Sequence, residues 1–441
     1  GIFIVVLIQN LGFSPLLYGV IAFIPRFFDA ITDPIMGFIS DNTRSRYGKR
    51  RQYVFLGAII TGISFILMWQ LYIENGIVFN FWYFLLCSLV FYLGITIFGI
   101  PFVAMGYEMS DDFHERTKIM AVSQFIGQFA WIIAPWIWVI IYDPAIFADP
   151  AAGTRELSIY IGIACTIFAI TPAIFIKSRS TIDDDNLVPL TRKNIGASFS
   201  NIFNIFKDAY KNIPFRKLCL ATFLVFNSFQ TIAAFSFFII VHYLFSGDAS
   251  SAGIWPTLHG SVGALITTLL VIPVVSKMAQ KYGKRQTFIV SQSISIIGYI
   301  LFWFLFIPGK PYMFLYALPF FSFGIGGLFT VMMSMTADVC DYEELQNGLP
   351  RKEGAFGAIY WWMVKLGTAL AGLFAGLIMW YVGFAPDAAS QPDGALFGLR
   401  FFYTFIPIMG TSLAIYVMWD YDIDEKRATE IKEELLIRNN S

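Results

Sequence analysis

Two carboxylates and one guanidinium lie inside a single apolar stretch, residues 16–40. Arg26, Asp29 and Asp33 are separated by three and four residues, so a helix places them on one face. Two carboxylates one turn apart repel, and one of them holds a proton unless a cation settles between them. Together with the nearby hydroxyl of Thr32, this face offers the oxygen ligands that hard cations prefer. The spacing therefore favours a site for a small cation.

An internally satisfied ion-pair cluster is the alternative for the same residues. Arg26 is positioned to neutralise one carboxylate, and such a cluster would only hold helices together. Pro34 follows Asp33 directly, and a proline leaves the carbonyl four residues earlier, that of Ala30, without its helical partner. That carbonyl becomes a further oxygen for an ion. The pattern of two acids one turn apart followed by proline favours the cation site over the cluster.

A second buried charge, Lys365, lies near the middle of the apolar stretch 355–382. A lysine in such a place needs a carboxylate partner, and the acidic pair described above supplies two candidates. Tyr360 and Trp361 lie just before it in the chain. An aromatic shelf beside a buried charge suits a sugar ring, whose C–H faces stack on aromatic rings while its hydroxyls need polar partners.

Other chemistries find little material in this chain. Three His and four Cys show no metal-ligand spacing. No nucleophile–base or phosphate-binding motif is present either, so we expect no enzyme and no cofactor beyond a coupling ion. Thirty Lys and Arg balance thirty Asp and Glu, which gives no basic excess for binding nucleic acid.

The composition requires a bilayer. Of 441 residues, 57% are hydrophobic and only 14% are charged, whereas soluble proteins carry about 25% charged residues. A soluble core cannot hide so much apolar surface. A charge near the middle of a bilayer costs on the order of 3 kcal/mol, so the charges inside the apolar stretches should face a cavity or one another.

Eleven apolar stretches are each long enough to cross the hydrocarbon as a helix. Gly1–Ile8 is apolar but too short, and we interpret it as the second half of a first helix that is truncated at its start. We therefore predict an all-α membrane protein with twelve spans. The eleven full spans are 16–40, 52–72, 80–105, 119–142, 157–177, 217–246, 252–277, 287–307, 311–337, 355–382 and 398–419.

The connections predict an orientation and a duplication. The loops at 41–51 and 277–285 are rich in Lys and Arg, which places them and both termini in the cytoplasm. Both loops contain the tetrapeptide Tyr-Gly-Lys-Arg, at equivalent positions of two six-span halves. The predicted parts are an N-terminal half (1–177), a cytoplasmic linker (178–216), a C-terminal half (217–421) and a cytoplasmic tail (422–441). Two such halves joined by a long segment are typical of major-facilitator transporters.

The linker and the tail are expected to differ. Phe199, Ile202, Phe203, Phe206 and Tyr210 form one apolar stripe, which predicts a short amphipathic helix on the membrane surface. The tail alternates charges, which predicts a solvated helix end without chemistry.

Several motifs resemble those of the glycoside–pentoside–hexuronide:cation symporters, a family within the major facilitator superfamily typified by melibiose permease. The first is the segment 29–49, which begins Asp-Ala-Ile-Thr-Asp-Pro and ends Arg-Tyr-Gly-Lys. The second is Ala-Asp-Val-Cys-Asp-Tyr-Glu at 337–343. The third combines Ile-Pro-Phe at 100–102 with Glu115 and Arg116. These motifs lie in both halves in the expected order, so the resemblance covers nearly the whole chain.

The resemblance implies roles for individual residues. Asp29, Asp33 and Thr96 would form the sodium or proton site, with Thr32 at the position of the family's asparagine. Lys365 would link the cation and sugar sites. A charge-pair gate on the cytoplasmic side would involve three residues, namely Arg116, Asp338 and Asp341.

The sugar side departs from the family pattern. Gly99, Val103 and Gln124 stand where melibiose permease has an aspartate, a tryptophan and an arginine. The cation residues are thus present while the sugar ligands are not. The candidate substrate residues that remain are Gln124, Tyr360, Trp361, Lys365 and Arg26.

These observations together predict a symporter for a sugar, glycoside or uronide, driven by Na⁺ or H⁺ and working by alternating access. We expect a monomer in the cell (inner) membrane. Two alternatives stay open: a sodium-dependent carrier of lysophospholipids, and a sensor on the same fold that transports nothing. The residues do not distinguish sodium from protons.

Overall fold

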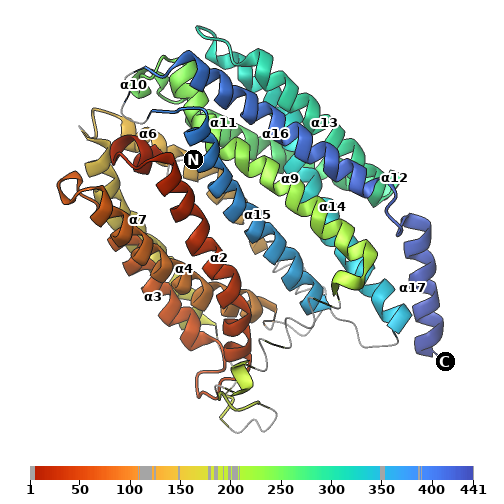
Figure 1. Cartoon of the computed structure of the whole chain (residues 1–441). Coiled ribbons are helices and arrows are strands. Elements are labelled where there is room, and N and C mark those ends of the chain that lie inside the picture. The colour runs from red at the N-terminus through yellow and green to blue at the C-terminus, as the bar shows by residue number, and fades with distance from the viewer. Residues whose placement is uncertain are drawn as a thin grey trace. The chain divides into compact units, whose positions relative to one another are not determined.

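A computed structural model describes most of the chain as helix (Figure 1). The described residues are 5–107, 109, 122–123, 126–147, 149–176, 180–182, 187–191, 193–196, 200, 207, 209–347, 353–385, 388 and 390–440.

Ten helical segments within these ranges are long and apolar enough to cross a membrane. A shorter apolar helix, Ile126–Tyr142, lies at the predicted span 119–142. Many large apolar side chains on the spans are exposed; Phe168 and Tyr416, for example, each have more than three quarters of their surface exposed. A lipid environment explains this exposure, whereas water does not. The ten segments are α2 (Pro15–Asp41), α3 (Arg51–Met68), α4 (Ile77–Tyr107), α7 (Pro150–Phe175), α9 with η4 (Ile213–Leu244), α10 to α12 (Ala249–Tyr282), α13 (Lys284–Leu305), η6 with α14 (Pro311–Asn347), α15 (Glu353–Tyr381) and α16 (Asp393–Trp419).

Side-chain caps and prolines set several of the helix starts. The hydroxyl of Ser14 accepts a hydrogen bond from Leu17 N before α2. Asp149 accepts from Ala151 N and Ala152 N before α7. In both helices a proline occupies the first turn, where its missing N–H costs nothing.

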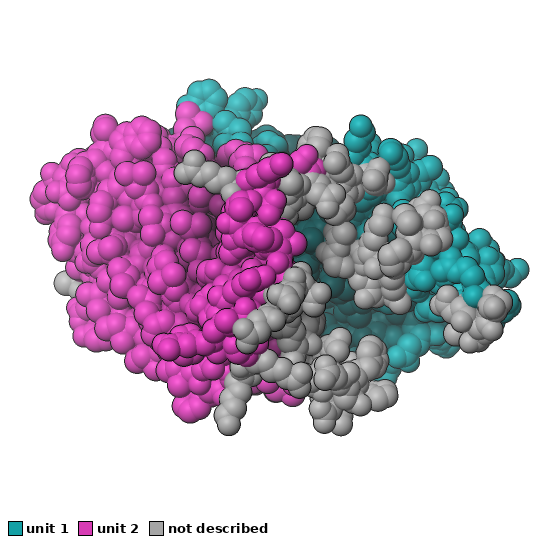
Figure 2. Space-filling view, turned by 90° about the horizontal axis from the view of Figure 1, so that it is seen from below, with its two compact units in different colours: residues 1–5, 131–139, 205–441 teal, residues 6–130, 140–204 magenta. Residues whose placement is uncertain are grey.

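The chain divides into two compact units, coloured in Figure 2. Unit 1 comprises residues 1–5, 131–139 and 205–441, and unit 2 comprises 6–130 and 140–204. This division differs from the predicted sequence halves at 131–139, which belongs with the C-terminal spans, and the boundary between the units falls within the predicted linker.

Unit 2 is built around the pairing of α3 with α4. A Cβ atom on Gly57 would lie only 2.4 Å from the backbone nitrogen of Phe98, so glycine allows the two helices to touch. Unit 1 repeats this device, because a Cβ atom on Gly298 of α13 would lie 2.4 Å from the nitrogen of Phe321 on α14. Close helix contacts of this kind are typical of membrane proteins.

A short 3₁₀ turn, η3 (Ala134–Trp136), interrupts the helix Ile126–Tyr142 at Pro135. Carbonyls in and just before this turn accept hydrogen bonds from α11 (Trp255–Ile266): Thr257 Oγ1 donates to Pro135 O at 2.9 Å, and Ser261 Oγ donates to Ile132 O at 2.6 Å. These bonds hold 131–139 within unit 1.

The glycines of the two Tyr-Gly-Lys-Arg motifs share a positive φ angle. Gly48 has φ of 85° and Gly283 has φ of 81°, a region that favours glycine. The repeat seen in the sequence therefore extends to the φ of its glycine, although residues 42–50 connect the helices in unit 2 and Gly283 alone connects them in unit 1.

The linker prediction lies mostly outside the described residues, because 197–199, 201–206 and 208 are not among them. The tail prediction is wrong. The tail forms α17 (Glu425–Asn440), and its residues Ala428, Ile431 and Leu435 are buried in the core of unit 1 rather than solvated.

Candidate functional site

The acidic pair lies in the middle of α2. Asp29 is buried, with 5% of its surface exposed, and Asp33 is half-buried one turn later. Pro34 lies inside the helix and has no N–H, so the carbonyl of Ala30 lacks its usual helical donor. The two carboxylates and this carbonyl all belong to one turn of a membrane-spanning helix.

Thr96 of α4 joins the two acids. Its Oγ1 donates a hydrogen bond to Asp29 Oδ1 at 2.7 Å and lies 3.1 Å from Asp33 Oδ1. Thr96 itself is buried, with 1% of its surface exposed. The three residues that the sequence assigned to the cation site are therefore within hydrogen-bond distance in the structure.

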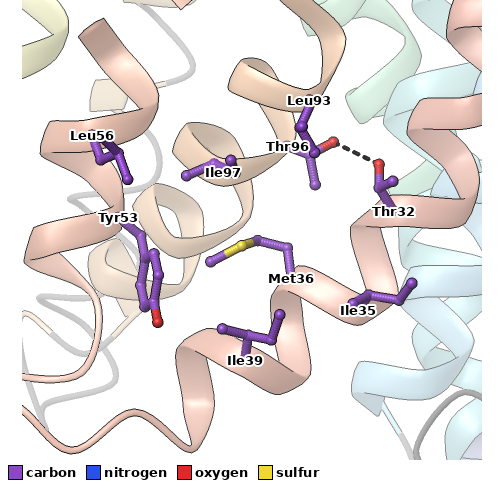
Figure 3. Close-up of a pocket in the computed structure, with 9 residues that line it drawn as sticks. All are labelled: Thr32, Ile35, Met36, Ile39, Tyr53, Leu56, Leu93, Thr96 and Ile97. Atoms are coloured by element: carbon purple, nitrogen blue, oxygen red, sulfur yellow. Dashed lines mark hydrogen bonds between the residues drawn. The ribbon is translucent and has the colours of Figure 1, made fainter. Parts of the chain in front are cut away.

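Thr32 adds a fourth oxygen. Its Oγ1 lies 3.2 Å from Thr96 Oγ1, the contact drawn in Figure 3, and 3.1 Å from Asp29 O. Four side-chain oxygens from α2 and α4 thus gather at one place: one from each acid and one from each threonine. Carboxylate and hydroxyl oxygens are suitable ligands for a hard cation and suitable acceptors for a proton.

A cavity of about 270 Å³ adjoins this oxygen cluster (Figure 3). Its walls come from α2, α3 and α4 and are mostly hydrocarbon; the hydroxyls of Thr32 and Thr96 lie at its edge. A sugar needs polar partners for its hydroxyl groups, so these walls do not suit one. The lining residues are Thr32, Ile35, Met36, Ile39, Tyr53, Leu56, Leu93, Thr96 and Ile97.

Arg26 is directed away from the acids. Its Nη1 donates to Ala22 O at 2.8 Å, and its guanidinium lies 5.9 Å from the ring centre of Tyr92. Among the described residues it forms no ion pair with Asp29 or Asp33. The ion-pair cluster that would have explained the α2 charges without a function is therefore not formed through Arg26.

The candidate substrate residues of unit 1 lie on α15 and differ in exposure. Trp361 is 45% exposed and stacks on Phe329, with ring centres 6.0 Å apart. Lys365, one turn further along, is half-buried. Tyr360 is completely buried in the core of unit 1. Adjacent residues of a helix point to different sides, so Trp361 is accessible while Tyr360 faces the core. The structure therefore does not support Tyr360 as a contact for the substrate.

Polar side chains of α9 attach to α15 beside Lys365. Asn227 Nδ2 donates to Gly367 O at 3.2 Å, and Gln230 Nε2 lies 3.4 Å from Thr368 Oγ1. Thr368, Lys365 and Trp361 are spaced to share one face of α15. These bonds fix that face relative to α9.

The predicted gate is described only in part. Asp338 and Asp341 lie on α14 and are buried, whereas Arg116 and the substrate candidate Gln124 lie outside the described residues. Asp338 Oδ2 is 2.6 Å from Lys284 Nζ, and Asp338 Oδ1 is 3.7 Å from Lys432 Nζ. Sequence reasoning missed both lysines, although Lys284 belongs to the repeated loop motif.

Long apolar spans, two compact units and a repeated sequence motif are typical of membrane transporters of the major-facilitator type. Solved structures agree on the fold. A bacterial homologue of the human lysosomal transporter Spinster, in an inward-facing and occupied conformation, matches with a TM-score of 0.67 at 15% identity, covering 95% of this chain and 92% of that one. The nucleoside transporter NupG matches with a TM-score of 0.61 at 13% identity, covering 95% and 92%.

The chain belongs to the MFS/sugar transport protein family, whose model matches residues 5–425. It is 23% identical to the glucuronide carrier protein homolog of Escherichia coli (strain K12), over 95% of this chain and 86% of that protein. It is 23% identical to the isoprimeverose transporter of Lactiplantibacillus pentosus, over 94% and 82%. A putative glycoside/cation symporter of E. coli (strain K12) is 20% identical, over 96% and 88%.

Proposed function

We propose that this chain is a cation-coupled symporter that moves a sugar-like solute by alternating access. Family membership and the names of its relatives support this class of transport. One observation carries the coupling: the hydroxyl of Thr96 lies within 3.1 Å of both Asp29 and Asp33 in the middle of a span. Such an oxygen cluster is expensive in a membrane unless it serves an ion.

The coupling ion is Na⁺ or H⁺, because clustered carboxylate and hydroxyl oxygens accept either one. The Thr96 oxygen is close to both carboxylates, and the Thr32 hydroxyl contacts backbone carbonyls of α2. A proton on one carboxyl lowers the charge of the acidic pair, and a sodium ion is bound by the same oxygens.

Binding of the cation neutralises the acidic pair and thereby favours substrate binding, with Lys365 as the link between the two sites. The membrane potential supplies the energy. One charge moved through 100 mV releases about 2.3 kcal/mol, which corresponds to roughly a fifty-fold substrate gradient.

The solute is a neutral or uronide-type sugar, because an aromatic ring and a charged group adjoin on α15. Trp361 and Lys365 are its contacts in unit 1, and Gln124 and Arg26 are candidates in unit 2. The gate is formed by Arg116 with the acids of α14. The protein works as a monomer in the cell (inner) membrane, with both termini in the cytoplasm.

The two alternatives receive less support. Relatives named for glucuronide, isoprimeverose and glycosides do not favour a lysophospholipid carrier. A sensor that transports nothing would show no uptake after reconstitution, so the experiment below separates it from a symporter.

The decisive experiment measures uptake of radiolabelled glucuronides and pentosides into proteoliposomes with an imposed membrane potential. Asp33→Asn and Thr96→Val should each abolish accumulation above equilibrium, because each removes an ion ligand. Thr171→Val is the matched control, since within the described part of the chain Thr171 Oγ1 donates to Ile167 O of its own helix, α7, and to no other group. Unchanged accumulation in Asp33→Asn would refute the site.

The same vesicles identify the ion. An inward Na⁺ gradient at equal pH drives uptake if sodium is the coupling ion, and a pH gradient without sodium drives it if the proton is. Failure of both gradients, with intact folded protein, would refute coupling.

A further inference from the structure

Arg400 lies near one end of unit 1 without an acid partner. It is the eighth residue of α16, about 10 Å along the axis from the helix start. Its side chain is half-buried, and within the described part of the chain it forms no ion pair. A charge in a membrane span is costly unless it is paired. The charge of Arg400 is therefore not balanced by the described residues of its own unit.

Two aromatic rings hold the guanidinium of Arg400 in place. Its central carbon lies 4.0 Å from the ring centre of Tyr243, near the end of η4 (Ile239–Leu244), and 4.7 Å from the ring centre of Trp303 on α13. Its Nη2 donates to Trp303 O at 2.9 Å. These contacts orient the group without neutralising it. A guanidinium has five N–H donors, so most of them stay available to a ligand.

The surroundings of the guanidinium place it at the level of lipid headgroups. The helix α13 begins directly after the glycine of the Tyr-Gly-Lys-Arg motif, and Trp303 lies two residues from its other end. Phe397, one turn before Arg400, is 60% exposed, and its ring centre is 5.8 Å from that of Trp303. Trp and Tyr are enriched where a membrane meets water. The Arg400 cluster comprises Arg400, Tyr243, Trp303 and Phe397.

Unit 2 contains a similar arrangement to which an acid is added. The guanidinium of Arg155 on α7 lies 4.5 Å from the ring centre of Tyr72, and its Nη1 donates to Leu71 O at 2.9 Å, just past the end of α3. Asp149, the N-cap of α7, is 3.9 Å from the other terminal nitrogen of the same arginine. The N-cap of α16 is Pro392, which has no carboxylate. An anion is thus what unit 1 lacks beside its arginine.

We propose that the Arg400 cluster binds the phosphate of an anionic phospholipid headgroup, with the acyl chains against the exposed aromatic side chains. A guanidinium matches the geometry of a phosphate, to which it donates two parallel hydrogen bonds. The membrane supplies this ligand at high local concentration, and Phe397 offers apolar surface that a free phosphate ion does not use. This inference does not depend on the proposed function.

The test measures lipid binding to the purified full chain by native mass spectrometry. Phosphatidylglycerol and phosphatidylcholine with the same acyl chains are titrated separately, because both contain a phosphate and only the first has a net negative charge. We expect phosphatidylglycerol to bind about ten-fold more tightly at one site, the size of effect typical of a hydrogen bond to a charged group. Arg400→Gln should remove this preference.

Two further variants make the result specific. Arg155→Gln is the matched control, because it removes an arginine that lies on an aromatic ring but already has an acid, and it should keep the preference for phosphatidylglycerol. Phe397→Glu leaves Arg400 in place and adds a carboxylate one helix turn away. That carboxylate competes for the guanidinium, so this variant should lose the preference. It also keeps the test open if Arg400→Gln does not fold.

The outcomes separate the lipid site from other readings of the same arginine. Equal binding of the two lipids to the unaltered protein would overturn the proposal, as would a preference that survives in both Arg400→Gln and Phe397→Glu. Inorganic phosphate is the third ligand. If it raises the melting temperature through Arg400 while the protein shows no lipid preference, the site takes a free anion and the lipid is refuted. Loss of uptake in the unaltered protein would refute the symporter and leave this test unaffected.

Discussion

The two Tyr-Gly-Lys-Arg loops provide an internal comparison between the units. In unit 2 the loop joins α2 to α3, and in unit 1 it joins α12 (Ile272–Tyr282) to α13. Gly48 and Gly283 have nearly the same positive φ. The two connections nevertheless differ in length, because residues 42–50 separate α2 from α3, whereas Gly283 alone separates α12 from α13.

The loops also share a role for arginine. Arg51 Nε donates to Ala173 O at 2.8 Å, near the last turn of α7. Arg285 Nη2 donates to Trp419 O, the residue at which α16 ends. In each unit a basic group from the loop thus satisfies carbonyls at the negative end of the final span.

The basic residues that form ion pairs with acids differ between the motifs, because Arg50 is the fourth residue of the first motif and Lys284 is the third residue of the second. Arg50 pairs with Asp41 at 2.5 Å, and 55% of the Asp41 side chain is exposed. Lys284 pairs with Asp338 at 2.6 Å, and only 7% of the Asp338 side chain is exposed. In unit 2 the arginine is the buried partner, with 10% of the Arg50 side chain exposed, whereas in unit 1 the acid is the buried partner. Removal of the basic residue therefore leaves an exposed acid in unit 2 and a buried acid in unit 1.

The largest expected loss of stability comes from breaking the ion pair between Lys284 and Asp338, in which the acid is buried. Lys284→Ala should destabilise the protein by about 2 kcal/mol, less than the 3–5 kcal/mol typical of a broken buried pair because Lys432 stays near Asp338. Arg50→Ala should cost about 1 kcal/mol, since Asp41 is then hydrated. Melting temperatures in detergent test this order. A similar fall in melting temperature for the two variants would contradict the comparison. So would a double variant, Lys284→Ala with Asp338→Asn, that is no more stable than Lys284→Ala alone.

The shared glycines should give an intermediate effect. At Gly283, where φ is 81° and ψ is 160°, alanine costs roughly 1–2 kcal/mol of backbone strain. Gly48→Ala should cost a similar amount if the two loops are equivalent. Gly394→Ala, in a helix with open space around it, is the control and should be neutral or slightly stabilising. A tolerated alanine at only one of the loops would break the equivalence.

The arginine caps should give the smallest effect. Arg51→Ala and Arg285→Ala should each cost about 1 kcal/mol, because each removes a charged donor from a helix end. Hydrogen exchange should speed up in the last turns of α7 and α16 respectively. The comparison fails if exchange changes elsewhere, or at only one of the two helices.

Hydropathy predicts the spans well and their ends less well. The predicted span 16–40 is α2, Pro15–Asp41, to within one residue at each end. The predicted span 157–177 begins seven residues too late, because α7 starts at Pro150 under the Asp149 cap. The polar residues of its first turns hide that start from a hydropathy average. Helix ends depend on local hydrogen bonds, which apolar content does not report.

The spacing within α2 predicts Asp29, Asp33 and Thr32 as oxygen ligands, whereas Thr96 is assigned only through the family resemblance. The surroundings of Asp338 could not be predicted, since its contact with Lys432 joins positions far apart in the chain. A usable signal was present nevertheless. Ala428, Ile431 and Leu435 form a stripe at helical spacing within the charged tail, and weighing that stripe against the charges would have predicted docking.

The segment Trp131–Val139 has a consequence for how this protein is assembled. It is encoded among the N-terminal spans, yet it packs in unit 1, where the Trp138 ring lies 4.2 Å from that of Phe237 and its Nε1 donates to Gly253 O. During synthesis this segment is therefore made before the C-terminal spans with which it packs. Unit 1 is thus translated in two separate parts, and its packing around Trp131–Val139 is complete only once the later spans have been made.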